Sequence, residues 1–297
     1  MAGVVSLMGP TPLAAQGNGR HGPPPAAPGQ SKKTTPSSTD QSTTPSTTPL
    51  TETDAATRGG LQTFGSWLDT AYVSAPGEAW VSISSAYWRS PSLREIDAPA
   101  MGLSVGVAQR MQVGVSLPYY HVRDEFGFTS HGLGASYVTA KFALTQDRRV
   151  NVSASPTLEI LGWSSPAVGC VNFVLPVSVQ TDAGAARLYG TTGYFSRGSI
   201  FGSGAAEWLA SSNVTLAATV AHSYSVASDP TSDALGITRH RTDASGSVYL
   251  SAGPAVVFFA SLGRTFAPVN ETSGRLALTG GMTMNVAGRA TQAPRVP

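Results

Sequence analysis

The chain reads VNVSASPTLEI over residues 150–160, and this stretch alternates strictly between two kinds of side chain. Its even-numbered positions carry Val, Val, Ala, Pro, Leu and Ile, and its odd-numbered positions carry Asn, Ser, Ser, Thr and Glu. Successive side chains of a β-strand point to opposite faces, so a period of two places one set on each face. The stretch therefore predicts a strand with one apolar face and one small polar face.

Segments with the same alternation fill the chain from Glu78 onward. Each is about 10 to 13 residues long, which suits a tilted strand that crosses a bilayer, whereas strands of soluble sandwiches average about five or six residues. An even number of such strands brings both ends of a barrel to the same side. The period indicates about twelve segments, near residues 78–88, 100–109, 111–122, 132–145, 149–161, 171–181, 185–196, 199–210, 213–225, 242–251, 255–266 and 274–286.

The connections between these segments alternate between tight turns and long charged loops. Tight turns are expected near Arg110, Asp147, Ala183, Ser211–Ser212 and Gly253–Pro254, and long loops at 89–99, 123–131, 162–170, 227–241 and 267–273. Transmembrane barrels have short turns on the periplasmic side, long loops outside and girdles of aromatic residues at both interfaces. The sequence thus predicts an all-β, antiparallel, up-and-down transmembrane β-barrel of about 12 strands, with a soluble β fold as the alternative. Trp88 and Trp208 are expected in the girdles.

The composition excludes several other classes of protein. Charged residues make up 12% of the chain, where soluble domains carry about 25%, and the net charge is only +2. No apolar run approaches the ~20 residues of a transmembrane helix, and no basic cluster indicates nucleic-acid binding. A single cysteine, Cys170, excludes a disulfide framework and a Cys-based metal site. We predict no cofactor, no metal and no nucleic-acid partner.

The N-terminal region differs in composition from the rest. Residues 1–16 resemble the end of an export signal with a small residue, Ala15, before the cleavage point, although an ordinary flexible N-terminus is the alternative. Nine of the 21 prolines lie within the first 60 residues, among runs of Ser and Thr. This composition predicts a disordered linker over residues 17–60. The barrel itself is expected to span residues 61–290.

The inward face of the predicted barrel carries small polar residues with few bulky side chains. Barrels of eight strands are filled by side chains and those of 16 to 18 form water channels, so about twelve strands predict a narrow pore or a ligand cavity. The candidates for lining the lumen are Lys141, Glu159, Arg187, Glu207, Arg275, Tyr137 and Thr139. The alternative role for the charged ones is ion pairing that fixes the barrel's shape. A tight hairpin centred on Gly198 would place Arg187 level with Glu207 or its neighbour.

Two stretches resemble a known family. Residues 113–119 read VGVSLPY and residues 132–142 read GLGASYVTAKF. They are similar to the outer-membrane barrels named after the MetA pathway of phenol degradation, in which a strand ending in Leu-Pro-Tyr precedes a Gly-x-Gly-Asp strand that leads to a Lys. Here Ala135 stands in place of the Asp, and Lys141 matches the Lys. The resemblance implies a channel-like protein for small compounds, aromatic or apolar ones included.

These patterns favour an outer-membrane channel or transporter for passive passage of small solutes. An autotransporter-type translocator, with a short N-terminal segment in the pore, is the alternative. An outer-membrane hydrolase ranks below both, because no nucleophile elbow, zinc helix or phosphate loop occurs. His222 and Ser223 are adjacent on a predicted strand and so point to opposite faces. We therefore predict that the protein is not an enzyme.

The expected partners follow from the fold class. They are the lipid bilayer of the bacterial outer membrane, the barrel assembly machinery and a small permeant whose identity the sequence does not give. The termini are expected in the periplasm, because an even strand count leaves both on the short-turn side. Association of barrels into homo-oligomers is a further arrangement that this fold class permits.

Overall fold

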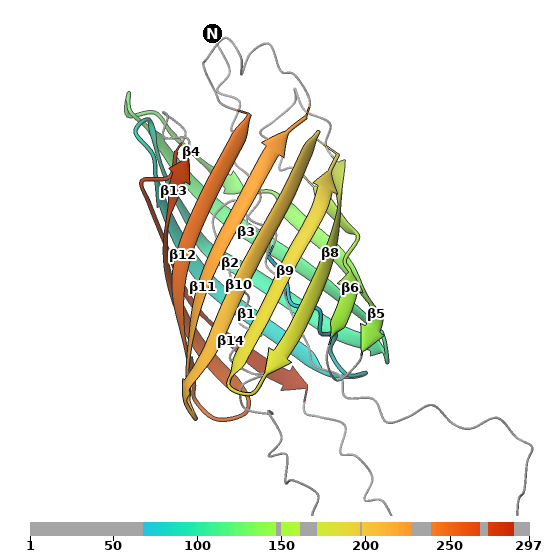
Figure 1. Cartoon of the computed structure of the whole chain (residues 1–297). Coiled ribbons are helices and arrows are strands. Elements are labelled where there is room, and N and C mark those ends of the chain that lie inside the picture. Colours follow the sequence, from blue (N-terminus) through green and yellow to red (C-terminus); the bar gives the residue numbers. More distant parts are fainter. Residues whose placement is uncertain are drawn as a thin grey trace, which may run out of the picture.

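The computed structural model describes residues 68–146, 150–160, 171–196, 198–226, 239–267 and 273–287, which form one closed β-barrel (Figure 1). Within these ranges, no helix is long and apolar enough to cross a membrane. The predicted export signal (1–16) and linker (17–60) lie outside the described residues, as do both ends of the range 61–290.

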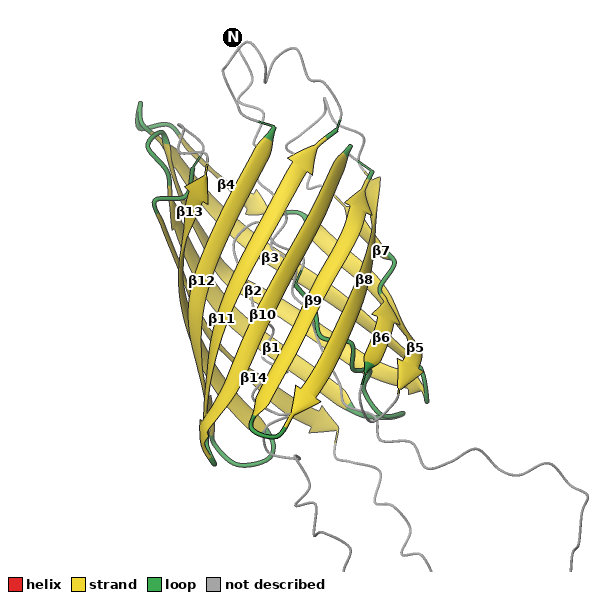
Figure 2. Cartoon of the chain, viewed as in Figure 1, coloured by secondary structure: helices red, strands yellow, loops and turns green. Residues whose placement is uncertain are grey.

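The described residues form fourteen strands, each antiparallel to its neighbours, around the wall (Figure 2). They are β1 (Ala79–Arg89), β2 (Leu93–Ala108), β3 (Met111–Asp124), β4 (Thr129–Leu133), β5 (Ser136–Gln146), β6 (Asn151–Ala154), β7 (Thr157–Ile160), β8 (Val171–Ala183), β9 (Ala186–Phe195), β10 (Ser199–Ser211), β11 (Val214–Ser225), β12 (His240–Ser251), β13 (Val256–Ala267) and β14 (Leu276–Ala287).

The fourteen strands occupy twelve positions around the barrel. β4 and β5 both pair with β3, and β6 and β7 both lie between β5 and β8, so each couple is one barrel strand with an interruption. β1 pairs with β14 from Ala79 opposite Ala287 to Arg89 opposite Leu276, which closes the sheet. The predicted fold class, a twelve-stranded up-and-down barrel, is therefore confirmed.

The two interruptions lie beside prolines. Pro156 separates β6 from β7, and its carbonyl accepts a hydrogen bond from Ala140 N at 3.0 Å. The carbonyl of Pro176, in β8, accepts one from Ser155 N at 2.9 Å, and that of Pro118, in β3, accepts one from Gly134 N at 2.8 Å. Proline removes a donor from the sheet, so the ladder breaks near it while the remaining carbonyls stay paired.

Two connections are shorter than the sequence predicted. The bounds expected for these loops, 89–99 and 123–131, are too wide. β2 already begins at Leu93, β3 runs to Asp124 and β4 begins at Thr129. Residues 93–97 pair with β1 on one side and with β3 on the other. Their charged side chains favoured a loop, but a sheet that extends beyond the apolar band can carry charge. The expectation that Trp88 belongs to an aromatic girdle is also wrong, because its side chain is buried.

The described turns at the opposite end are tight, as predicted, whereas the turn predicted near Asp147 lies outside the described residues. β8 and β9 are joined by Gly184 and Ala185, and Gly184 has a φ of 62°. Two-residue hairpins need a positive φ in this position, which glycine adopts without strain. The start of β1 and the end of β14 lie at this same end of the barrel.

The distribution of apolar residues is the reverse of that in a soluble protein. The exposed apolar side chains on the outer wall are Ile83, Leu103, Phe142, Leu144, Leu158, Phe173, Val179, Leu188, Val220, Leu250, Phe258, Leu262 and Leu278. Ser, Thr, Gln and Glu residues are buried on the inner side. A continuous exposed apolar band of this kind needs a lipid environment.

Candidate functional site

A segment without strand structure, residues 68–77, lies inside the barrel ahead of β1. We call it the lumen segment; Figure 2 shows it as a loop behind the front strands. Leu68, Ala71, Val73 and Ser74 in it are at most 1% exposed. The interior of the barrel is therefore occupied here by the protein's own chain.

Side chains of the wall satisfy the backbone of the lumen segment. The Thr191 hydroxyl accepts a hydrogen bond from Asp69 N and donates one to Asp69 O, both at 3.0 Å. Gln180 Oε1 accepts from Ala71 N at 3.2 Å, and Gln112 Oε1 accepts from Ser74 N at 2.9 Å. These side chains replace the ladder partners that a strand would have, because buried backbone groups need hydrogen bonds.

Lys141, a predicted lumen residue, holds the segment by charge. It lies on β5, is 1% exposed and forms a 2.8 Å ion pair with Asp69. Its ammonium also donates to the Thr70 carbonyl at 2.6 Å. The Ser155 hydroxyl donates to the other carboxylate oxygen of Asp69 at 3.4 Å. Lys141 therefore contacts the lumen segment rather than open solvent.

Arg187 and Glu207 form the second charged group in the lumen. They are directly opposite each other on β9 and β10, as the hairpin register predicted, with Nη1 and Oε2 3.6 Å apart. Arg187 also pairs with Asp182 at 2.9 Å, and its guanidinium lies 5.4 Å from the ring centre of Tyr72 in the lumen segment. The Tyr72 hydroxyl donates to Asp182. This network ties the segment to the wall at the short-turn end.

Large side chains fill the neighbouring part of the lumen. Leu68 packs in a buried cluster with residues from six strands, namely Trp80, Tyr189, Ala205, Ala217, Tyr249, Val257 and Phe259. The expectation of an interior with few bulky side chains is wrong for this part. The reason is that alanines on β10 and β11 leave room for aromatic residues from β1, β9, β12 and β13.

Glu159, Tyr137 and Thr139 lie toward the other end of the lumen. Glu159 is 0% exposed and accepts hydrogen bonds from the Tyr137 hydroxyl and from Asn172 Nδ2, both at 3.0 Å. The hydroxyls of Thr139 and Thr157 are 2.9 Å apart. Arg275 is different: it precedes β14, is exposed and donates its backbone N–H to the carbonyl of Arg89.

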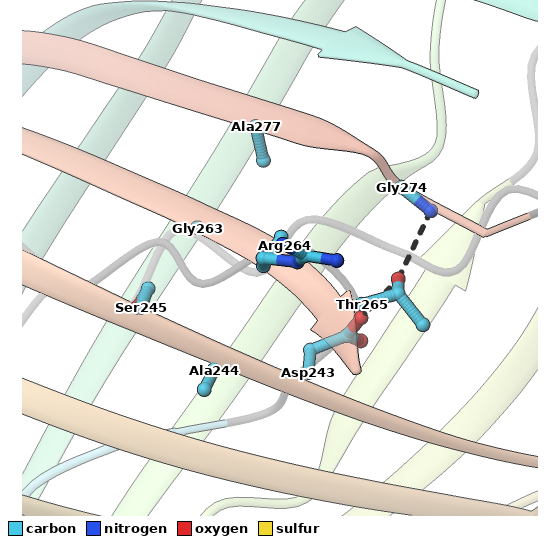
Figure 3. Close-up of a pocket in the computed structure, with 8 residues that line it drawn as sticks. All are labelled: Asp243, Ala244, Ser245, Gly263, Arg264, Thr265, Gly274 and Ala277. Carbon is cyan, nitrogen blue, oxygen red and sulfur yellow. Dashed lines mark hydrogen bonds between the residues drawn. The ribbon is translucent and has the colours of Figure 1, made fainter. Parts of the chain in front are cut away.

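A second polar cluster near this end was not predicted. Asp243 on β12 pairs with Arg241 at 2.9 Å. Asp243 also accepts a 2.6 Å hydrogen bond from the Thr265 hydroxyl, which in turn accepts from Gly274 N (Figure 3). The alternation of Arg241 and Asp243 on one strand face was the available signal. Asp69, Gln112, Gln180 and Thr191 were also missed, because their roles depend on a segment with no periodic pattern.

The described part of the chain has no group of three or more His, Cys, Asp and Glu side chains that could hold a metal ion. His222 contacts Thr242, its Nδ1 lying 2.8 Å from the hydroxyl.

Comparisons with solved structures agree on the architecture. The COG4313 outer membrane channel from Pseudomonas putida F1 superposes with a TM-score of 0.55 at 11% identity, covering 71% of this chain and 96% of that one. The NanC porin gives a TM-score of 0.53 at 8% identity, covering 69% of this chain and 98% of the other. The chain has the fold of an outer-membrane channel. No protein-family model matches the sequence. No curated protein matches it either.

Within this channel fold, the lumen segment and the side chains that bind it form the candidate functional site. They lie where a solute moving through the barrel would have to pass. Among the described residues, hydrogen bonds and ion pairs hold a constriction at this point.

Proposed function

We propose that the protein is an outer-membrane channel for the passive passage of small solutes, apolar and aromatic compounds included. The observation that carries the proposal is the way in which the lumen segment is held. Wall side chains bind its backbone at Asp69, Ala71 and Ser74, and one backbone hydrogen bond, from Gly77 N to the Gly106 carbonyl, anchors its end to β2. It can therefore shift without breaking the hydrogen-bond ladder that closes the barrel.

Apolar surface inside the barrel supports the choice of solute. One inward-facing cluster, formed by Tyr137, Val174, Phe195 and Phe201, lies toward the long-loop end. The cluster around Leu68 lies toward the short-turn end. An apolar solute that contacts these surfaces removes apolar area from water, which is favourable and which a uniformly polar pore would not offer. The two similar structures are a porin and an outer membrane channel, which also favours passage over chemistry.

The stretches that resemble the phenol-degradation barrels have structural roles here. Pro118, from the Leu-Pro-Tyr match, accepts the hydrogen bond from Gly134 at the interruption between β4 and β5. Lys141, from the Lys match, binds Asp69 of the lumen segment. Membership of that family, with aromatic permeants, is part of the proposal.

Single-channel recording in planar bilayers tests the function. The full chain is compared with a refolded chain that begins at Glu78 and therefore lacks the lumen segment. We expect small steps from the full chain and steps several times larger from the shortened one. Absence of steps from both proteins, with folded barrels shown by gel mobility, would overturn the channel proposal.

The lumen segment also favours the autotransporter alternative, since such translocators have a segment in the pore. The two proposals differ in where the N-terminal region lies. We propose a periplasmic N-terminus, with residues 1–16 as export signal and 17–60 as linker. An epitope tag inserted after Thr53 should then be inaccessible to antibody on intact cells. Labelling of intact cells would favour the translocator.

A further inference from the structure

Three arginines form a row across neighbouring strands on the outside of the barrel. Arg89 on β1 is directly opposite Arg94 on β2, and Arg94 is directly opposite Arg123 on β3. All three side chains are exposed and alternate with the inward-facing Trp88 and Glu95. The ion pairs found among the described residues include none of the three.

Such a row is unfavourable by itself. Like charges in direct cross-strand positions repel each other. An anion between the guanidinium groups reverses the sign of the interaction, and arginine binds phosphate through two parallel hydrogen bonds. The row therefore has the chemistry of a phosphate site.

The arginines also line a cavity. It has a volume of about 450 Å³ and is formed by the β1–β2 and β3–β4 connections, with Ser90, Ser92 and Phe126 among its other lining residues. Asp124 and Glu125 border it too. Asp124 Oδ1 accepts a 2.8 Å hydrogen bond from Phe128 N, so this carboxylate fixes the loop. The three arginines outnumber the two carboxylates, so the lining of the cavity has a net positive charge.

The next row toward the middle of the barrel is apolar and aromatic. Tyr87 is opposite Ile96, Ile96 is opposite His121, and His121 stacks on His131 with ring centres 5.7 Å apart. Phe126 beside the cavity is 79% exposed. The arginine row thus lies at the edge of the apolar band, where the headgroups of a membrane lipid lie.

We propose that Arg89, Arg94 and Arg123 bind the phosphate groups of an outer-leaflet lipid whose acyl chains run along the apolar wall below. The site goes beyond the channel proposal, because it lies outside the barrel and needs no passage of solute. It rests only on the proposed orientation, with the β1–β2 connection on the outer side.

Binding of purified lipid A carrying both phosphates tests the site, using the full chain in a neutral detergent and native mass spectrometry. Each of Arg89→Gln, Arg94→Gln and Arg123→Gln should weaken binding about ten- to a hundredfold, the value of one charge-assisted hydrogen bond. The triple variant should lose nearly all specific binding. Arg110→Gln, an exposed arginine in the β2–β3 turn, is the matched control and should bind as the wild type does.

A second readout separates binding from folding. Without lipid, the triple variant should unfold at the same or a slightly higher temperature than the wild type, because a repulsion has been removed. With lipid A, only the wild type and Arg110→Gln should gain stability. Equal lipid A binding by the wild type and the triple variant would overturn the proposal. So would inorganic phosphate that displaces lipid A at equal concentration, since the site would then bind free phosphate.

Discussion

Lys141 on β5 and Asp69 in the lumen segment form a 2.8 Å ion pair although 72 positions separate them in the chain. The lysine is buried, and the same ammonium donates to the Thr70 carbonyl. One wall residue thus binds both a side chain and the backbone of the segment that fills the lumen. The contact connects the stability of the barrel to the state of its interior.

Replacing Asp69 by Ala should destabilise the folded barrel. The Lys141 ammonium would keep its buried position without a carboxylate partner, a change that costs about 3–5 kcal/mol in closed interiors. Urea titration in detergent, followed by gel mobility, measures the free energy of unfolding. Ser155→Ala, which removes only a 3.4 Å hydrogen bond to the same carboxylate, is the control and should change stability by less than about 1 kcal/mol. Equal effects of both substitutions would contradict the importance of the ion pair.

A double-mutant cycle on Arg187 and Glu207 reports how wet this part of the lumen is. If water reaches the pair, its coupling energy should lie near the ~0–1 kcal/mol of an exposed ion pair. Burial by the lumen segment and the aromatic cluster instead predicts coupling of about 2 kcal/mol or more. Thermal unfolding of Arg187→Ala, Glu207→Ala and the double variant gives the value. Because Arg187 also pairs with Asp182, the cycle is repeated in an Asp182→Asn background.

The Arg187–Glu207 contact could be predicted from the sequence, whereas the Lys141–Asp69 contact could not. A short hairpin fixes the register of its two strands, so a turn placed next to Gly198 leaves each residue of one strand with a single partner, or its neighbour, on the other. Asp69 lies in a segment with no hydrophobic period, and no local rule places such a segment inside a barrel. The error at residues 93–97 has a related cause: charge indicates exposure to water, but exposed residues can belong to a strand as well as to a loop.

Cysteine labelling on intact cells checks which end of the barrel faces outward. In a Cys170→Ser background, Phe126→Cys in the β3–β4 connection should react with an impermeant maleimide, and Ser212→Cys in the β10–β11 turn should not. The reason is that the β3–β4 connection lies at the end opposite the tight turns. After the cells are broken open, both positions should react. Labelling of Ser212→Cys alone on intact cells would reverse the proposed orientation.

Arginine at two successive positions of β13 tests the assignment of faces. Leu262 is 56% exposed on the outer wall, and its neighbour Ser261 faces inward. Leu262→Arg should impair membrane assembly, because an arginine on the lipid face near the bilayer midplane costs about 2–4 kcal/mol. Ser261→Arg should assemble and change the conductance instead. The measurements are the folded fraction in outer-membrane preparations and single-channel recording, and equal behaviour of the two variants would refute the assignment.

Gly106 on β2 offers the most direct way to move the lumen segment without deleting it. A Cβ atom added there would lie 2.1 Å from the Ala75 carbonyl oxygen, far inside contact distance. The Gly106 carbonyl also accepts a 2.8 Å hydrogen bond from Gly77 N, so the segment is anchored at this point. Gly106→Ala should therefore displace residues 75–77 from the wall, since β2 is held on both sides by its ladder. We expect larger conductance steps and a loss of about 1–3 kcal/mol in stability, typical of overpacking.

Gly204→Ala on β10 is the matched control, because its added Cβ would meet nothing closer than 3.9 Å. If Gly106→Ala conducts as Gly204→Ala does, residues 75–77 do not restrict the pore, and the constriction must be sought farther inside, around Asp69 and Lys141.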